Sequence, residues 1–221
     1  MITDEEIFKN VTQKLEFDPR INSSNIIVAV KDGIVTLTGS VNTYAAKYMA
    51  EDNVKSIRGV MGIAEELKVN LYAQQRERTD ADIARVARDA LDWNVMIPDE
   101  KIQVIVEGGI ITLTGEVTQN YQRESAVSAV HYLQGVKNVI NRIQLKPTIS
   151  PSEVSSKILN EFERNARIDA SKISIEIDSN KIILRGTVHS WAEHKEATKA
   201  AWSIPGVTSV ENLICLVYEI N

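Results

Sequence analysis

The chain has 221 residues, of which 43% are hydrophobic and 25% charged, and its formal net charge is −5. A net negative charge argues against unspecific binding to nucleic acid or to anionic bilayers, since both require clustered lysine and arginine. Cys215 is the single cysteine, which excludes an intrachain disulfide, and no apolar run is long enough for a transmembrane helix.

The first residues, Met1 to Glu6, contain no basic segment followed by an apolar one, so no secretory signal is expected. As written, the sequence predicts a cytoplasmic protein. A periplasmic location is the alternative if a leader has been removed.

The first predicted element is a helix that starts after Thr3. A threonine hydroxyl can cap the free amides of a helix, and Glu6 can reach back to the Thr3 amide. Ile7, Val11 and Leu15 follow at helical spacing, so one stripe of this helix should be buried.

The pattern then changes to a period of two, which is typical of strands. Asp32-Gly33 tolerates the positive φ of a tight hairpin turn. A second amphipathic helix is predicted through 46–57 and a closing strand over 63–69. The predicted core positions of the hairpin are Ile26, Val28 and Val30 before the turn and Val35, Leu37 and Val41 after it.

The same order of elements recurs twice more. Gly39, Gly115 and Gly186 occupy matching places, 76 and 71 residues apart, and other markers repeat at the same offsets. The chain therefore contains three copies of one unit. We place the units at 1–73, 77–147 and 150–221, joined by short linkers at 72–78 and 146–151 that favour a compact or semi-rigid chain.

In each unit, the first two strands should form an antiparallel hairpin. The second and third are joined through a helix and should run parallel. The sequence thus predicts an α+β protein of three tandem αββαβ units, each a three-stranded mixed sheet with two helices on one face. Gly39 and its counterparts are expected at a bulge or beneath a crossing helix, where a side chain would not fit.

These motifs together resemble the BON domain (bacterial osmotically inducible Y protein and nodulation). The resemblance covers nearly the whole chain. It rests on the "TLTG" strands at 36–39 and 112–115 and on a closing Gly-Val-x-x-Val-x-Asn motif. Unit one departs from that motif with Ile63 and Glu65, and unit three has Arg185 where the strand motif has threonine. The closing motif comprises Gly135, Val136, Val139 and Asn141 in unit two, and Gly206, Val207, Val210 and Asn212 in unit three.

The resemblance implies a non-catalytic binding module, often exported and linked with osmotic or envelope stress. Some members bind phospholipid, and one relative senses potassium. Three functions stay open: an adaptor for a protein partner or membrane-associated assembly, a phospholipid-headgroup module, and a monovalent-cation sensor.

No catalytic or metal site is predicted, and no cofactor. The histidines are His131, His189 and His194, and none has the H-E-x-x-H spacing of a zinc helix. Ser190 and Glu193 are better explained as a capping box. Cys215 should face away from the core with no base beside it, so we do not expect an enzyme.

Two surfaces are the candidates for binding. The uncovered sheet face should show Ile34, Ile105 and Ile110. We favour packing of this face between units or against a second chain, with a partner or lipid contact as the alternative.

The second candidate surface is aromatic. Tyr44, Tyr121 and Trp191 stand at the start of the second helices, as hydrophobic staples or interfacial contacts. Phe17 and Trp93 recur just after the first helices. Few lysines and arginines lie near the helix-start aromatics, so a polybasic lipid site is not expected.

Overall fold

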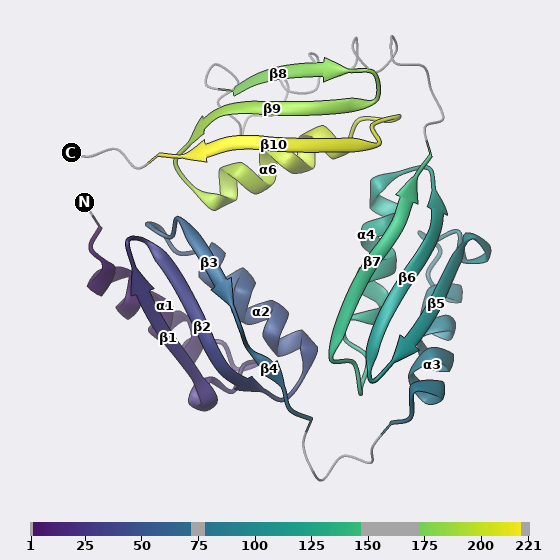
Figure 1. Cartoon of the computed structure of the whole chain (residues 1–221), viewed down its shortest axis with the longest axis horizontal. Helices are drawn as coiled ribbons and strands as arrows, with labels where there is room; N and C mark the ends of the chain where they lie inside the picture. Colours follow the sequence, from purple (N-terminus) through teal and green to yellow (C-terminus); the bar gives the residue numbers. More distant parts are fainter. Residues whose placement is uncertain (1, 72–77, 147–172, 218–221) are drawn as a thin grey trace.

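The computed structural model describes residues 2–71, 78–146 and 173–217 (Figure 1). Unit one comprises α1 (Asp4–Phe17), the short helix η1 (Ser23–Asn25), β1 (Ile26–Lys31), β2 (Ile34–Val41), α2 (Tyr44–Lys55), β3 (Gly62–Glu65) and β4 (Lys68–Val69). Unit two comprises α3 (Asp80–Asp92), η2 (Asp99–Lys101), β5 (Ile102–Glu107), β6 (Ile110–Val117), α4 (Asn120–Val130) and β7 (Asn138–Leu145). Unit three comprises β8 (Ile173–Asp178), β9 (Lys181–Val188), α6 (Trp191–Trp202) and β10 (Ser209–Leu216).

The strand pairings confirm the predicted mixed sheet in all three units. β1 runs antiparallel to β2, β5 to β6, and β8 to β9. β3 and β4 run parallel to β2, as β7 does to β6 and β10 to β9. The predicted first helix of unit three and most of both linkers lie outside the described residues.

Each unit has its own core between one sheet face and the helices described for that unit. In unit one, Ile7, Val11 and Leu15 of α1 are buried with Val35 and Leu37 of β2, as the spacing predicts. Matching clusters fill units two and three. Because successive strand residues point to opposite faces, the intervening residues of the same strands face outward.

Capping boxes at Thr3 and Thr79 start α1 and α3, as predicted. The Asp4 carboxylate also accepts from the amides of Asp32 and Gly33, at 2.8 and 2.9 Å. Asp80 accepts from both glycines of the matching turn in unit two. One carboxylate thus fixes each described first helix to its own hairpin.

A side chain does not fit at Gly39, as predicted, but the expectation that a crossing helix excludes it is wrong. Its φ is +108°, and a Cβ there would lie 2.0 Å from the carbonyl oxygen of Asn25. The same holds for Gly115 and the carbonyl of Lys101. The obstacle is the backbone that enters the neighbouring strand, and not a crossing helix.

The predicted third strand of unit one is interrupted, since β3 ends at Glu65 and β4 begins at Lys68. Glu65 Oε1 accepts from the amide of Leu67 at 2.6 Å. At the matching places, Asn141 and Asn212 accept from the amides of Ile143 and Ile214. The motif asparagine is therefore a local backbone acceptor, and Glu65 replaces it with a longer side chain.

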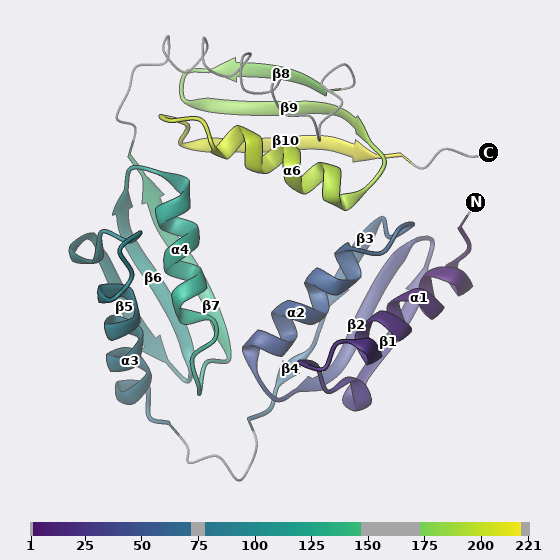
Figure 2. The ribbon, with the colours of Figure 1, turned by 180° about the vertical axis from the view of Figure 1, so that it is seen from behind.

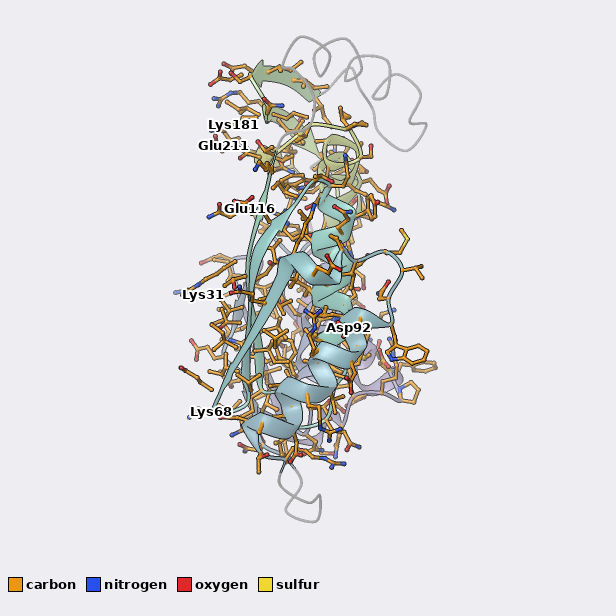
Figure 3. All side chains as sticks on the ribbon, turned by 90° about the vertical axis from the view of Figure 1, so that its right-hand side faces the viewer. Lys31, Lys68, Asp92, Glu116, Lys181 and Glu211 are labelled. Carbon is orange, nitrogen blue, oxygen red and sulfur yellow. The ribbon has the colours of Figure 1, made fainter. Side chains whose placement is uncertain are left out.

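The three units lie around a triangle with the second helices α2, α4 and α6 turned toward its centre (Figures 1 and 2). All three sheets face one broad side of the molecule. On this sheet side lie Lys31, Lys68, Glu116, Lys181 and Glu211, whereas Asp92 lies on the opposite side (Figure 3).

Candidate functional site

The units meet at three seams, each made by the start of one second helix and the region near the end of the next. We call them the first seam (units one and two), the second seam (units two and three) and the third seam (units three and one). Because the order is head to tail, the third seam closes the chain on itself, as in a cyclic oligomer.

At the third seam, Trp191 Nε1 donates to the carbonyl oxygen of Val60 at 2.9 Å. The Trp191 ring packs against the core of unit one. Lys195 Nζ lies 3.0 Å from Asp52 Oδ1 of unit one. His194 lies edge-on to Trp191, with ring centroids 5.0 Å apart, and burial lowers the pKa of His194.

At the first seam, Tyr44 packs against the core of unit two. Burial raises the pKa of Tyr44. One turn along α2, the ring of Tyr48 lies 5.0 Å from that of His131. A side chain at the first position of the second helix thus reaches into the next unit at two seams.

The second seam differs because Asn120 occupies the position of Tyr44 and Trp191. Here the Arg123 guanidinium lies over the Trp202 ring, 4.7 Å from its centroid. Burial lowers the pKa of Arg123. A cation–π contact therefore stands where the other seams insert an aromatic ring.

The predicted site residues fall into two groups. Tyr44 and Trp191 are engaged at seams, whereas Tyr121 is half exposed on α4. Ile34, Ile105 and Ile110 are exposed on the sheet side. The described units do not pack together through these sheet faces, because they meet through their second helices. Packing of the sheet faces against a second chain stays a prediction.

The sheet side is chemically mixed. Its isoleucines are dispersed among charged residues, including the labelled lysines and glutamates of Figure 3. In unit three, Arg185 and Glu176 form an exposed ion pair at 3.7 Å. Single exposed isoleucines between charges are ordinary protein surface.

A denser apolar surface lies directly after α3. Trp93 is 88% exposed, Val95 97% and Met96 50%, and we call these three residues the α3 tip. Phe17 is 89% exposed at the corresponding end of α1. Phe17 and Trp93 were expected to recur at these places, whereas Val95 and Met96 were not predicted as part of a surface. The sequence does contain a signal for them, because they form an apolar run that belongs neither to the helical pattern before it nor to the strand pattern after it.

The local backbone holds the α3 tip outward. The amide of Asn94 donates to the carbonyl of Leu91 at 3.1 Å, and Asn94 Oδ1 accepts from the amide of Met96 at 3.0 Å. The amide of Ile97 donates to the carbonyl of Asn94, and Ile97 is buried. This turn is therefore anchored at both ends, so its apolar side chains are presented in a defined geometry.

The charges near the α3 tip are mainly acidic. Asp89, Asp92 and Glu100 are exposed around it, and Arg88 Nε is paired with Asp92 at 2.8 Å. Such a rim repels anionic headgroups and suits a partner with a basic rim.

Metal-ligating side chains are dispersed within the described ranges. There, no group of three or more His, Cys, Asp or Glu residues could hold a metal ion. Cys215 is exposed, as predicted. Ser190 caps α6, but the Glu193 carboxylate accepts from the amide of His189 and not from that of Ser190.

Among the helices described, none is long and apolar enough to cross a membrane.

A family model of the BON domain matches residues 3–70, 79–147 and 151–218. The chain is 29% identical over 154 residues to "Osmotically-inducible protein Y" of Escherichia coli (strain K12), which covers 65% of this chain and 73% of that protein.

Among solved structures, the chain is similar to CdsD, a structural protein of the Type III secretion system of Chlamydia trachomatis. The identity is 14% and the TM-score 0.26, over 97% of this chain and 93% of that one. The C-terminal domain of CdsD gives 13% identity and the same TM-score, over 98% of this chain and 100% of that one.

Proposed function

The chain belongs to the BON domain family, in three tandem copies, and from this premise we propose that it is a non-enzymatic adaptor that binds a protein partner through the α3 tip. The observation that carries the proposal is the exposure of Trp93 and Val95 on an anchored turn. Aromatic and methionine side chains are enriched where proteins bind one another. An apolar tip of this kind inserts into an apolar groove on the partner protein. The acidic residues around the tip favour a partner whose groove is bordered by basic residues.

The proposal includes a role in osmotic or envelope stress. It is supported by the name of the Escherichia coli relative, osmotically-inducible protein Y. A strain that lacks the gene should grow more slowly than its parent after a rise in external osmolarity, and equal growth would contradict this part of the proposal.

Binding through the α3 tip is tested by photo-crosslinking in the host cell. A photoreactive phenylalanine analogue at Val95 should give a discrete adduct with one partner. The same analogue at Ile105 on the sheet side is the matched control, since both side chains are exposed. An adduct at Ile105 and none at Val95 would assign the contact to the sheet side.

Substitution gives an independent measurement. The triple variant Trp93→Ser, Val95→Ser, Met96→Ser should lose the crosslinked partner from affinity pull-downs and keep its melting temperature, because the tip side chains are largely exposed. The control Ile34→Ser, Ile105→Ser, Ile110→Ser should retain the partner. If the tip variant still retained the partner in pull-downs, the proposal would be overturned.

A phospholipid-binding function is the second candidate, because an exposed tryptophan suits the depth of lipid headgroups. Flotation with phosphatidylcholine vesicles, with and without phosphatidylglycerol, separates the two. The protein-partner proposal expects no flotation with either vesicle. Flotation that is lost in the triple tip variant would favour the lipid module.

A further inference from the structure

His131 is a buried histidine at the first seam. It follows the last residue of α4, and its amide donates to the carbonyl of Val127 at 3.1 Å. The residue is only 6% exposed. Its ring lies between Tyr48 of unit one and Tyr132 of its own unit, at centroid distances of 5.0 and 3.8 Å. Nε2 is buried and has no hydrogen-bond partner in the described part of the chain.

Charged groups stand on three segments that belong to or pack against α2 and α4. α2 contributes Asp52, one turn from Tyr48, and the segment after α1 contributes Asp18 and Arg20. α3, which packs on α4, carries Arg88 and Asp92 near its end.

Each of the three carboxylates is already engaged. Asp18 accepts from Arg20 and Asn53, Asp52 is paired with Lys195, and Asp92 with Arg88. An imidazolium at position 131 would therefore find no free carboxylate among these groups. Burial lowers the pKa of His131 below its ordinary 6.5.

We propose that the first seam is an acid-sensitive switch, which neutral His131 keeps closed and protonated His131 releases. In the closed seam, a charged ring would be buried between two tyrosines with an unsatisfied Nε2–H, which is unfavourable. In the open seam, water hydrates the charge. The contact of the neutral ring with Tyr48 across the seam favours the closed form.

The direction of the pH dependence follows from linkage. The open form binds the proton more tightly, with a pKa of about 6.5, so acidification favours opening. The ratio of open to closed molecules should rise by up to about tenfold for each pH unit below that value. Above it both forms are neutral, and the seam should close again.

Opening would uncover Tyr44, the covered part of Tyr48 and the surface of unit two against which they pack. The switch would thereby enlarge the aromatic surface that the chain presents at this seam in acid. This inference does not depend on the proposed role of the α3 tip.

The test is a distance measurement across the first seam in the full chain. Spin labels are placed at Lys68→Cys and Glu116→Cys, two exposed residues of units one and two, in a Cys215→Ser background (Figure 3). Double electron–electron resonance is recorded from about pH 8 to about pH 5. We expect one narrow distance at high pH and a reversible, longer and broader population that grows below about pH 6.5.

Two variants make the assignment specific. His131→Phe keeps an aromatic ring but cannot be protonated, so its seam should stay closed at all pH values, whereas His131→Lys should open it even at high pH. His194→Phe is the matched control, since that histidine is also partly buried but lies outside the first seam, and it should leave the response unchanged. Circular dichroism confirms that each variant is folded.

An acid response in His131→Phe equal to that of the parent chain would overturn the proposal. So would an unchanged distance in the parent chain down to about pH 5.

Discussion

The indole nitrogen of Trp191 donates a hydrogen bond of 2.9 Å to the carbonyl oxygen of Val60, and this bond joins the third unit to the first across 131 residues of sequence. Tyr44 occupies the same position in unit one and packs into unit two. Asn120 occupies it in unit two. The three seams therefore use the same position of the second helix but different side chains at it. A single substitution can thus weaken one seam and leave the other two intact.

Trp191→Ala should loosen the third seam and leave the three cores folded. The substitution removes the hydrogen bond to Val60 and the packing on unit one, and we expect a loss of about 2 kcal/mol, less than for a fully buried aromatic residue. Small-angle scattering should show a larger radius of gyration. Tyr121→Ala is the control, because the Tyr121 ring is half exposed, and it should change neither the stability nor the radius of gyration. Unchanged compactness in Trp191→Ala would contradict the seam.

The ion pair between Lys195 and Asp52 should contribute little to the third seam and depend on salt. Both side chains are more than half exposed, at 69% and 51%, so we expect about 0.5 kcal/mol. In a double-mutant cycle, Asp52→Lys and Lys195→Asp should each lower the melting temperature, and the double variant should recover part of the loss. The coupling energy between the two residues should decrease in high salt, because salt screens exposed charges. A coupling energy that persists in high salt would indicate a pair that is less hydrated than the exposed fractions suggest.

Asp18 should stabilise unit one at neutral pH through its carboxylate. Arg20 donates to both carboxylate oxygens, at 2.8 and 2.7 Å, and Asn53 Nδ2 donates at 3.0 Å. These bonds hold the pKa of Asp18 well below its ordinary 3.8. A lowered pKa means that the stabilisation is present above about pH 4 and is lost as the pH falls further.

Asp18→Asn should therefore reduce the free energy of unfolding by about 2 kcal/mol at neutral pH. The difference from the parent chain should narrow in acid, which urea unfolding at a series of pH values would measure. Asp32→Asn, at an exposed turn residue with positive φ that asparagine tolerates, is the control. A deficit of Asp18→Asn that stays constant with pH would argue against an ionised carboxylate at that place.

Gly39→Ala should destabilise unit one severely. The new Cβ would lie 2.0 Å from the carbonyl oxygen of Asn25, in a backbone with φ of +108°. We expect a loss above about 3 kcal/mol, since backbone atoms cannot move aside as side chains do. Gly108→Ala is the control, because φ is +59° and no atom lies within 4 Å, so it should cost about 1 kcal/mol. Thermal unfolding that ranks the two in the opposite order would contradict this account.

Most of each unit could be predicted because its determinants are local. The Thr3–Glu6 capping box, the Asp32-Gly33 turn and the alternation of Val35 and Leu37 involve residues close in sequence. The break between β3 and β4 was not predicted, although Glu65 was recognised as a departure from the motif. At this place the Glu65 carboxylate accepts from the amide of Leu67, a local contact that the hydrophobic pattern does not record.

The sequence by itself determined three copies of one αββαβ unit, since period, turn chemistry and capping act over a few residues. Only the tertiary structure decided which aromatic side chains are free. Tyr44, Trp191 and Trp93 all stand at helix ends, yet the first two are covered by a neighbouring unit and Trp93 is exposed. The physical reason is that burial at a seam depends on which surfaces meet after folding, and the two sides of the third seam are separated by 131 residues.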